Sequence, residues 1–224
     1  FTAIFKLVPG LPGEAEAALA LWQQTPVAQQ SAAVRRAVVG AEVAAGQLEQ
    51  AERHWQALPP SSIDDWRQGG HLAVARQDYA EAVQRWQRVL ALGGTLEDYY
   101  QAGMAAGSAG QREQQLAWLE RAAEWAPEDP RIQADLGFAL ANSPEPAQRQ
   151  AAIPVLEKAV RLRPDDYRLS DALATLQGSF GQVPQALGNW KHTIDLESAI
   201  EPRDEKLSND LFRARRAHQE HNDR

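Results

Sequence analysis

The side chains that could do chemistry in this chain of 224 residues are few and scattered. His218 and His221 lie three positions apart, which brings two imidazoles close together on a helix, but a zinc site needs further ligands and none is evident nearby. Three pairs of adjacent carboxylates stand where helices are expected to begin: Asp64-Asp65, Glu128-Asp129 and Asp165-Asp166. Capping of free backbone N–H groups explains these pairs without acid–base catalysis. We therefore expect neither a metal nor a cofactor.

Motifs of the common enzyme classes are missing. The sequence contains no Gly-Lys-Ser/Thr phosphate loop, no Gly-x-Ser-x-Gly elbow, no His-Glu-x-x-His pair and no cysteine. The formal net charge of -7 argues against nucleic acid as the main partner, because phosphate binding requires a basic face. No apolar run reaches the roughly 18 residues that a membrane span needs. These observations favour a binding function and argue against an enzyme.

An Ala-x-x-x-Trp pair recurs along the chain and defines the elements that position its side chains. The copies are Ala18/Trp22, Ala51/Trp55, Ala82/Trp86 and Ala186/Trp190, with weaker copies at Gln115/Leu119 and Ala152/Leu156. The steps between copies run from 31 residues (Trp55 to Trp86) to 37 residues (Leu119 to Leu156). A period of about 34 residues is the signature of stacked helix pairs. The pattern predicts an all-α fold, an α-α superhelix of about five helix pairs plus a terminal helix.

Each repeat is expected to consist of a helix A followed by a helix B. In the clearest repeat, helix A covers residues 62–75 and helix B covers residues 79–92. Ala82, Trp86 and Val89 share one face of helix B, which predicts that the tryptophans of this column fill the core instead of stacking on sugars. Trp118 and Trp125 lie off the column, so we expect both to be partly exposed.

The repeats divide the chain unevenly. We expect the array to cover residues 1–201, beginning with a lone helix B at residues 14–24. A long turn at residues 142–146 is expected to precede a helix at residues 152–162 and to account for the 37-residue step. Residues 202–224 are expected to form a terminal helix, either a cap or a connector to a further domain. The chain lacks an initiator Met, so we expect it to be part of a longer protein.

The side chains of helix A that face away from helix B are predicted to line a concave groove for partners. They are Arg36, Arg67, His71, Tyr100, Met104, Phe138, Arg168 and Asp171. Aromatic, Met and Arg side chains are enriched in binding patches, while the alternative is an ordinary solvated groove. If the groove binds partners, charge reversal at Arg67 and Arg168 is expected to weaken capture.

At several positions the chain resembles the tetratricopeptide repeat family. The matching positions are Trp66 with Gly70, Tyr99 with Gly103, Leu136-Gly137, Ala82 with Trp86, and Ala159 with Pro164. The resemblance covers about residues 14–200 and implies a scaffold with protein partners. The family's Lys and Asn clamp for a peptide carboxylate has no counterpart at the matching groove positions, which disfavours recognition of a chaperone C-terminus.

A narrower resemblance is to bacteriophage adsorption protein A and the related exopolysaccharide export proteins. It is carried by residues 164–169, 194–196 and 206–218. In those families a periplasmic repeat array leads into an outer-membrane β-barrel. The resemblance implies a non-catalytic periplasmic scaffold, associated with the outer membrane, that binds proteins and a passing polysaccharide. Two alternatives remain open: a cytosolic adaptor that binds a peptide or helix of a partner protein, and the regulatory part of an enzyme whose catalytic domain lies elsewhere.

Overall fold

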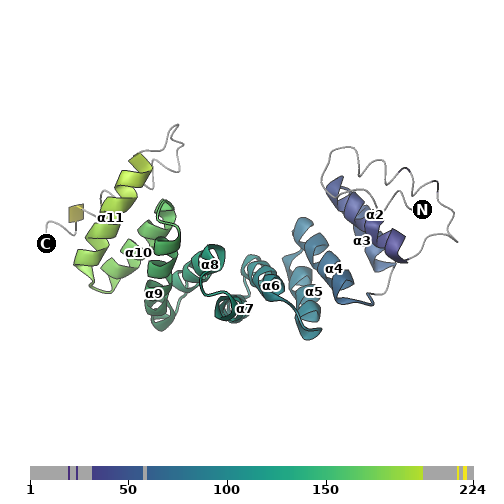
Figure 1. Cartoon of the computed structure of the whole chain (residues 1–224), viewed down its shortest axis with the longest axis horizontal. Helices are drawn as coiled ribbons and strands as arrows, with labels where there is room; N and C mark the ends of the chain where they lie inside the picture. Colours follow the sequence, from purple (N-terminus) through teal and green to yellow (C-terminus); the bar gives the residue numbers. More distant parts are fainter. Residues whose placement is uncertain are drawn as a thin grey trace. The chain divides into compact units, whose positions relative to one another are not determined.

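The computed structural model describes residues 20, 24, 32–57, 60–198, 216, 219 and 220 (Figure 1). Within these residues every regular element is a helix, which confirms the predicted all-α class. None of the described helices has the length and apolar character needed to cross a bilayer. Most of the predicted helix at residues 14–24 and most of residues 202–224 lie outside the described residues, as do both candidate metal ligands, His218 and His221.

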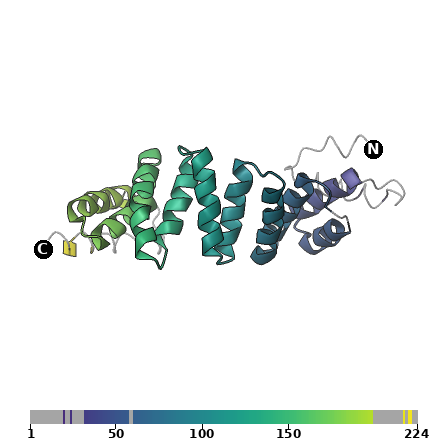
Figure 2. The ribbon, with the colours of Figure 1, turned by 90° about the horizontal axis from the view of Figure 1, so that it is seen from below.

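The chain divides into two compact units, Phe1–Gln111 and Arg112–Arg224. The first unit contains α2 (Ala32–Ala44), α3 (Leu48–Gln56), α4 (Ile63–Ala75), α5 (Tyr79–Ala91) and α6 (Leu96–Ser108). Each helix packs against the next, and α2 also contacts α4 (Figures 1 and 2). In this order α2, α4 and α6 are A helices, and α3 and α5 are B helices. The predicted bounds of α4 and α5 are confirmed to within one residue.

The second unit has the same construction. It contains α7 (Arg112–Trp125), α8 (Pro130–Ala141), α9 (Pro146–Leu162), α10 (Tyr167–Ser179) and α11 (Val183–Ser198). Successive helices again pack against each other, and the A helices α8 and α10 also touch (Figure 2). Helices α7, α9 and α11 are the B helices. The predicted boundary between residues 201 and 202 stays a prediction.

Helix α9 begins earlier than predicted, at Pro146 instead of about residue 152. Proline is tolerated here because the first helical residue has no intrahelical partner for its N–H. The buried Ser143 Oγ accepts a hydrogen bond from the Glu145 backbone N–H (3.0 Å) and donates one to Gln148 Oε1 (2.5 Å). Arg149 Nη1 also donates to the Ser143 carbonyl oxygen at 2.8 Å. The additional residues of this repeat therefore extend a helix and do not form a long turn.

The tryptophans of the Ala-x-x-x-Trp column are buried wherever the structure describes their side chains. Trp55 is 8% exposed, Trp86 1% and Trp190 3%, which confirms their predicted place in the core. Helix α4 lies between two of these indoles and has a glycine at each contact. A Cβ atom on Gly69 would collide with the Trp55 ring, and one on Gly70 would lie 2.7 Å from Trp86 Cε2. Glycine is needed at both positions because any side chain would displace an indole.

A left-handed residue ends the A helices α2, α4, α6 and α10. It is a glycine in three of these turns, with φ of 73° at Gly46, 72° at Gly110 and 78° at Gly181. In the turn after α4 the same place is taken by Gln77, with φ of 60°. The next N–H, that of Asp78, bonds to the Ala73 carbonyl oxygen at 2.9 Å, as in a Schellman motif. A non-glycine residue is strained in this conformation.

Candidate functional site

The predicted groove residues of the first unit fall at two fixed positions of the A helices. Arg67 and His71 are the fifth and ninth residues of α4, and Tyr100 and Met104 are the fifth and ninth residues of α6. Arg36 is the fifth residue of α2. We call the fifth-position residues (Arg36, Arg67, Tyr100) the inner row and the ninth-position residues (Gly40, His71, Met104) the outer row.

The inner-row arginine of α4 is bound within the chain. Arg67 donates to both carboxylate oxygens of Asp98, from Nε to Oδ1 at 2.8 Å and from Nη2 to Oδ2 at 2.7 Å. Its Nη1 donates to Asp64 Oδ1 at 2.7 Å. Asp98 also accepts from the N–H (2.8 Å) and hydroxyl (2.9 Å) of Thr95 and so completes a capping box at the start of α6. The hydrogen bonds from Arg67 to Asp98 raise the pKa of the guanidinium.

The same arrangement recurs one repeat earlier. Arg36 of α2 forms an ion pair with Asp65 of α4, and Asp65 accepts hydrogen bonds from the N–H groups of Ser61 (2.8 Å) and Ser62 (2.9 Å). Burial alone would raise the pKa of Asp65 and of Asp98, but the hydrogen bonds and the arginines outweigh burial and hold both values below the usual range. We call these two pairs the inter-repeat clamps. Both arginines are thus engaged within the chain, and their use in partner binding stays a prediction.

The outer row presents side chains with less internal engagement. Met104 is 38% exposed, a high value for a large apolar side chain. His71 as a whole is exposed, but one side of its ring packs edge-on against Trp86, with ring centroids 5.0 Å apart and an interplanar angle of 89°. Burial of the ring lowers the pKa of His71, opposed in part by Asp98 and Glu97, so the imidazole is mainly neutral at pH 7. The outer row therefore offers an uncharged surface on rigid helices.

In the second unit the predicted groove residues are less regular. Phe138 is the ninth residue of α8 and Asp171 the fifth of α10, and both are half-buried. Arg168 is exposed, but its Nε and Nη2 donate to the two oxygens of Asp166, each at 3.0 Å. Asp166 in turn caps α10 by accepting from the Arg168 backbone N–H at 3.2 Å. Arg168 is therefore bound to the cap of its own helix.

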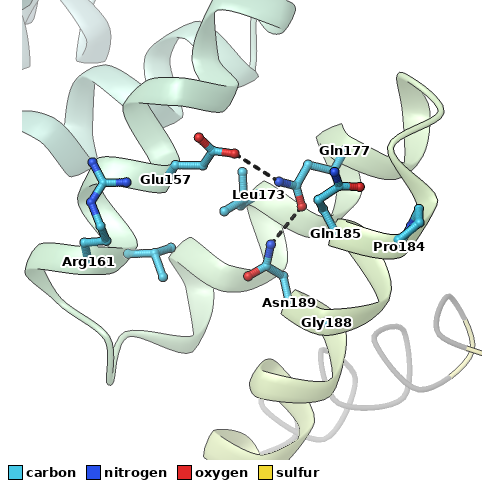
Figure 3. Close-up of a pocket in the computed structure, with 9 residues that line it drawn as sticks. Glu157, Arg161, Leu173, Gln177, Pro184, Gln185, Gly188 and Asn189 are labelled. Atoms are coloured by element: carbon cyan, nitrogen blue, oxygen red, sulfur yellow. Dashed lines mark hydrogen bonds between the residues drawn. The ribbon is translucent and has the colours of Figure 1, made fainter.

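Sequence reasoning missed a pocket in the second unit (Figure 3). Its volume is about 370 Å³, and α9, α10 and α11 contribute the side chains around it. The lining residues are Glu157, Val160, Arg161, Leu173, Gln177, Pro184, Gln185, Gly188 and Asn189. The buried Gln177 is the link among them, since its Nε2 donates to Glu157 Oε1 (3.4 Å) and its Oε1 accepts from Asn189 Nδ2 (2.8 Å). The sequence contains only weak evidence for this pocket. Gly188 and Asn189 precede Trp190, whereas the longer residues Gln84 and Arg85 precede Trp86 in the second repeat.

Two further histidines contact groups within the chain. His54 Nδ1 lies 2.8 Å from an oxygen of Glu42, a fully buried carboxylate. His192 Nε2 lies 2.8 Å from the Pro164 carbonyl oxygen. No group of three or more His, Cys, Asp or Glu side chains that could hold a metal ion occurs among the residues that the structure describes.

Comparisons with known proteins agree with this architecture. The sequence profile of the tetratricopeptide repeat matches residues 99–129, which include most of α6 and all of α7 up to Trp125. The structure resembles that of YrrB, described as a TPR protein with an unusual peptide-binding site. The sequences are 19% identical, the match covers 90% of this chain and 99% of YrrB, and the TM-score is 0.70.

The structure also resembles two crystal structures of MamA. One has a TM-score of 0.67 at 16% identity and covers 75% of this chain and 93% of MamA. The other, MamA AMB-1, has a TM-score of 0.65 at 20% identity and covers 78% and 94%. These identities establish a shared fold only, and they confirm the predicted tetratricopeptide-like solenoid. The sequence has no significant match among curated proteins.

Proposed function

We propose that this chain is a non-catalytic scaffold that binds segments of partner proteins on the A-helix face of its repeats. The observation that carries the proposal is the outer row, where His71 and Met104 stand exposed on neighbouring A helices. Exposed Met and aromatic side chains on a rigid frame are typical of binding patches. The tetratricopeptide match at residues 99–129 and the peptide-binding site named for YrrB support a peptide-like partner.

The inter-repeat clamps support this role indirectly. Arg36 with Asp65 and Arg67 with Asp98 connect successive A helices without using the outer row. A surface that is already ordered loses less conformational entropy when it binds a partner. The clamps therefore favour a preorganised face for an extended or helical segment.

A site-specific crosslinking experiment tests the proposal. A photoreactive amino acid is placed at Met104 and, as a control, at Gln84, an exposed residue of the B helix α5. After irradiation in cells that express the protein, discrete adducts are expected from position 104 and not from position 84. Identical adducts at both positions, or none at 104, would contradict the A-helix face as the binding surface.

Matched variants extend the test to affinity for each partner so identified. Met104→Glu introduces a charge into the outer row and is expected to weaken binding at least tenfold, because the carboxylate must be desolvated at the contact. Gln84→Glu carries the same charge change on α5 and should bind as wild type does. Helical content by circular dichroism should be equal for both, and unchanged binding by Met104→Glu would count against the proposal.

For the compartment, we propose a periplasmic location associated with the outer membrane, in an exopolysaccharide-export or phage-adsorption system. The support is the sequence resemblance at residues 164–169, 194–196 and 206–218. The alternative, a cytosolic adaptor, is equally consistent with the fold. Cell fractionation distinguishes the two. Recovery in the outer membrane with this segment facing the periplasm would support the proposal, and recovery as a soluble cytosolic protein would refute it.

A further inference from the structure

The pocket of the second unit lies where a buried arginine side chain lies in the first unit. The Ala-x-x-x-Trp column supplies the correspondence: Arg85 directly precedes Trp86 in α5, and Asn189 directly precedes Trp190 in α11. Both tryptophans are buried to the same degree, so the residues before them face the preceding B helix in the same way. The two positions can therefore be compared side chain by side chain.

In the first unit Arg85 fills this position completely. Its Nη2 and Nη1 donate to the two carboxylate oxygens of Glu52 at 2.5 Å and 3.1 Å, and Nη1 also donates to the Gly69 carbonyl oxygen at 3.0 Å. Its Nε donates to Glu81 at 2.8 Å, and the guanidinium stacks on the Trp55 ring, 3.9 Å from the ring centroid. The side chain is only 3% exposed. The contact between two successive B helices is thus built around one guanidinium.

In the second unit the same position is under-filled. Asn189 is several atoms shorter than arginine and reaches only Gln177. Beside it, Gly188 has open space where a Cβ atom would stand. Leu173 of α10 takes the place of Gly69, since each is the seventh residue of its A helix, and it gives the pocket an apolar wall. The close-up shows Glu157, Gln177 and Asn189 joined by hydrogen bonds across the pocket (Figure 3).

The charged groups of the pocket have few partners within the described residues. Glu157 accepts only the long hydrogen bond from Gln177 and forms no ion pair within the described residues. Arg161, one turn further along α9, likewise forms no ion pair with any residue in that part of the chain. In the first unit the carboxylate that holds Arg85 belongs to Glu52, which pairs with both Arg85 and Arg76. In the repeat register Glu52 corresponds to Ile153 of α9, so Glu157 lies one turn further along its helix. A carboxylate without an ion pair, placed beside amide groups and an apolar wall, has the chemistry of a guanidinium site.

We propose that this pocket, which includes the position of Arg85 in the first unit, binds an arginine side chain of a partner protein. The guanidinium donates to Glu157 and to the Asn189 side-chain oxygen, and its aliphatic stem packs against Leu173. Arg161, at the edge of the pocket, pairs with an acidic residue next to that arginine on the partner. Glu157, Arg161 and Asn189 all belong to the B helices α9 and α11, so this proposal does not depend on partner binding by the A-helix face.

The test uses a blocked amino acid as the probe. Nα-acetyl-arginine amide is titrated into the ¹⁵N-labelled full chain at constant ionic strength, and the side-chain amide signals of Gln177 and Asn189 are followed by NMR. Saturable shifts are expected. Nα-acetyl-citrulline amide has nearly the same shape without the charge and should bind at least tenfold more weakly, because charge-assisted hydrogen bonds are the stronger ones.

Three variants complete the design. Glu157→Gln should weaken the probe at least tenfold, while Glu120→Gln, an exposed carboxylate of α7, should leave the affinity unchanged. Asn189→Arg should place a guanidinium in the pocket beside Glu157 and abolish probe binding in a folded chain. The proposal is overturned if the shifts do not saturate, if citrulline binds equally well, or if Glu157→Gln binds like wild type. Crosslinking at position 104 should be unaffected by Asn189→Arg, so the two proposals can fail separately.

Discussion

Gly70→Ala should destabilise the wild-type protein but stabilise a variant that lacks the indole of Trp86. Trp86 is 1% exposed and packs directly on Gly70. Truncation of such a side chain to alanine leaves a cavity and is expected to lower the free energy of unfolding by about 3–5 kcal/mol. Trp125→Ala is the matched control, because that indole is 47% exposed, and its expected cost is below about 1 kcal/mol.

The second substitution acts through one short contact. In the wild type, the new Cβ of Gly70→Ala would lie 2.7 Å from Trp86 Cε2, so a rigid indole must move, at a net cost of about 1–3 kcal/mol. In the Trp86→Ala background the same methyl group meets the cavity. Alanine then contributes its helix propensity, about 1 kcal/mol better than glycine. The coupling between the two sites should be about 2–4 kcal/mol, at or above the upper end for residues in contact.

Urea unfolding followed by far-UV circular dichroism measures the cycle, since tryptophan fluorescence would change with the substitution itself. Repeat arrays can unfold in parts, so hydrogen exchange of the α4 amides provides a local reading. Two results would refute the reasoning. A loss below about 1 kcal/mol for Trp86→Ala would place Trp86 outside the core. Equal destabilisation by Gly70→Ala in both backgrounds would show that the indole contact is not what requires glycine.

Three further predictions concern stability. Gln77→Gly should raise the free energy of unfolding by about 1 kcal/mol, because glycine adopts the left-handed conformation without strain. Thermal unfolding measures this change, and a lower melting temperature would contradict the prediction. Trp86→Phe should lower the free energy of unfolding by about 1 kcal/mol less than Trp55→Phe does, as measured by urea unfolding. The reason is that Trp55 Nε1 donates to the Asp65 carbonyl oxygen at 3.0 Å, whereas the buried Trp86 Nε1 has no acceptor among the described residues. Equal losses would argue against this. The lowered pKa values of Asp65 and Asp98 contribute stability that is fully present above the usual aspartate pKa of about 3.9 and is lost as the pH falls through the lowered values. Asp98→Asn should therefore flatten the loss of stability in acid unfolding curves, and an unchanged slope would exclude the clamp as its source.

The fold was predictable because few principles decide it. A column such as Ala82, Trp86 and Val89 can be buried only against a neighbouring helix, so its period predicts both the helix pairs and the core. The bounds of α4 and α5 were predicted to within one residue, and the structure shows what sets them: the Ser62 side chain caps the start of α4, and Gly93 has a positive φ after the end of α5. The start of α9 was missed because Pro146 was interpreted as part of a turn, although proline equally suits a first helical position.

The candidate site was less predictable because it depends on partners far along the chain. Register alone placed Arg67 on the A-helix face, but nothing local shows that Asp98, 31 residues later, holds its guanidinium. The pocket depends on a comparison that only the structure permits. Arg85 and Asn189 hold the same position in two repeats. The shorter Asn189 side chain leaves space beside it, and a pattern of hydrophobic residues cannot predict that space.

The inter-repeat clamps also determine how the array could grow. Arg67 holds the same position in α4 that Arg36 holds in α2. A second copy of α4 and α5 inserted before Thr95 would therefore form clamps of the same kind. The first Arg67 would pair with the copied Asp65, and the copied Arg67 would pair with Asp98. The guanidinium of Arg85 is different, since Val83 occupies the α5 position that corresponds to Glu52 in α3. Duplication alone would leave the copied arginine buried without its carboxylate. Lengthening this protein by one repeat therefore requires one accompanying exchange, Val83→Glu in the first copy.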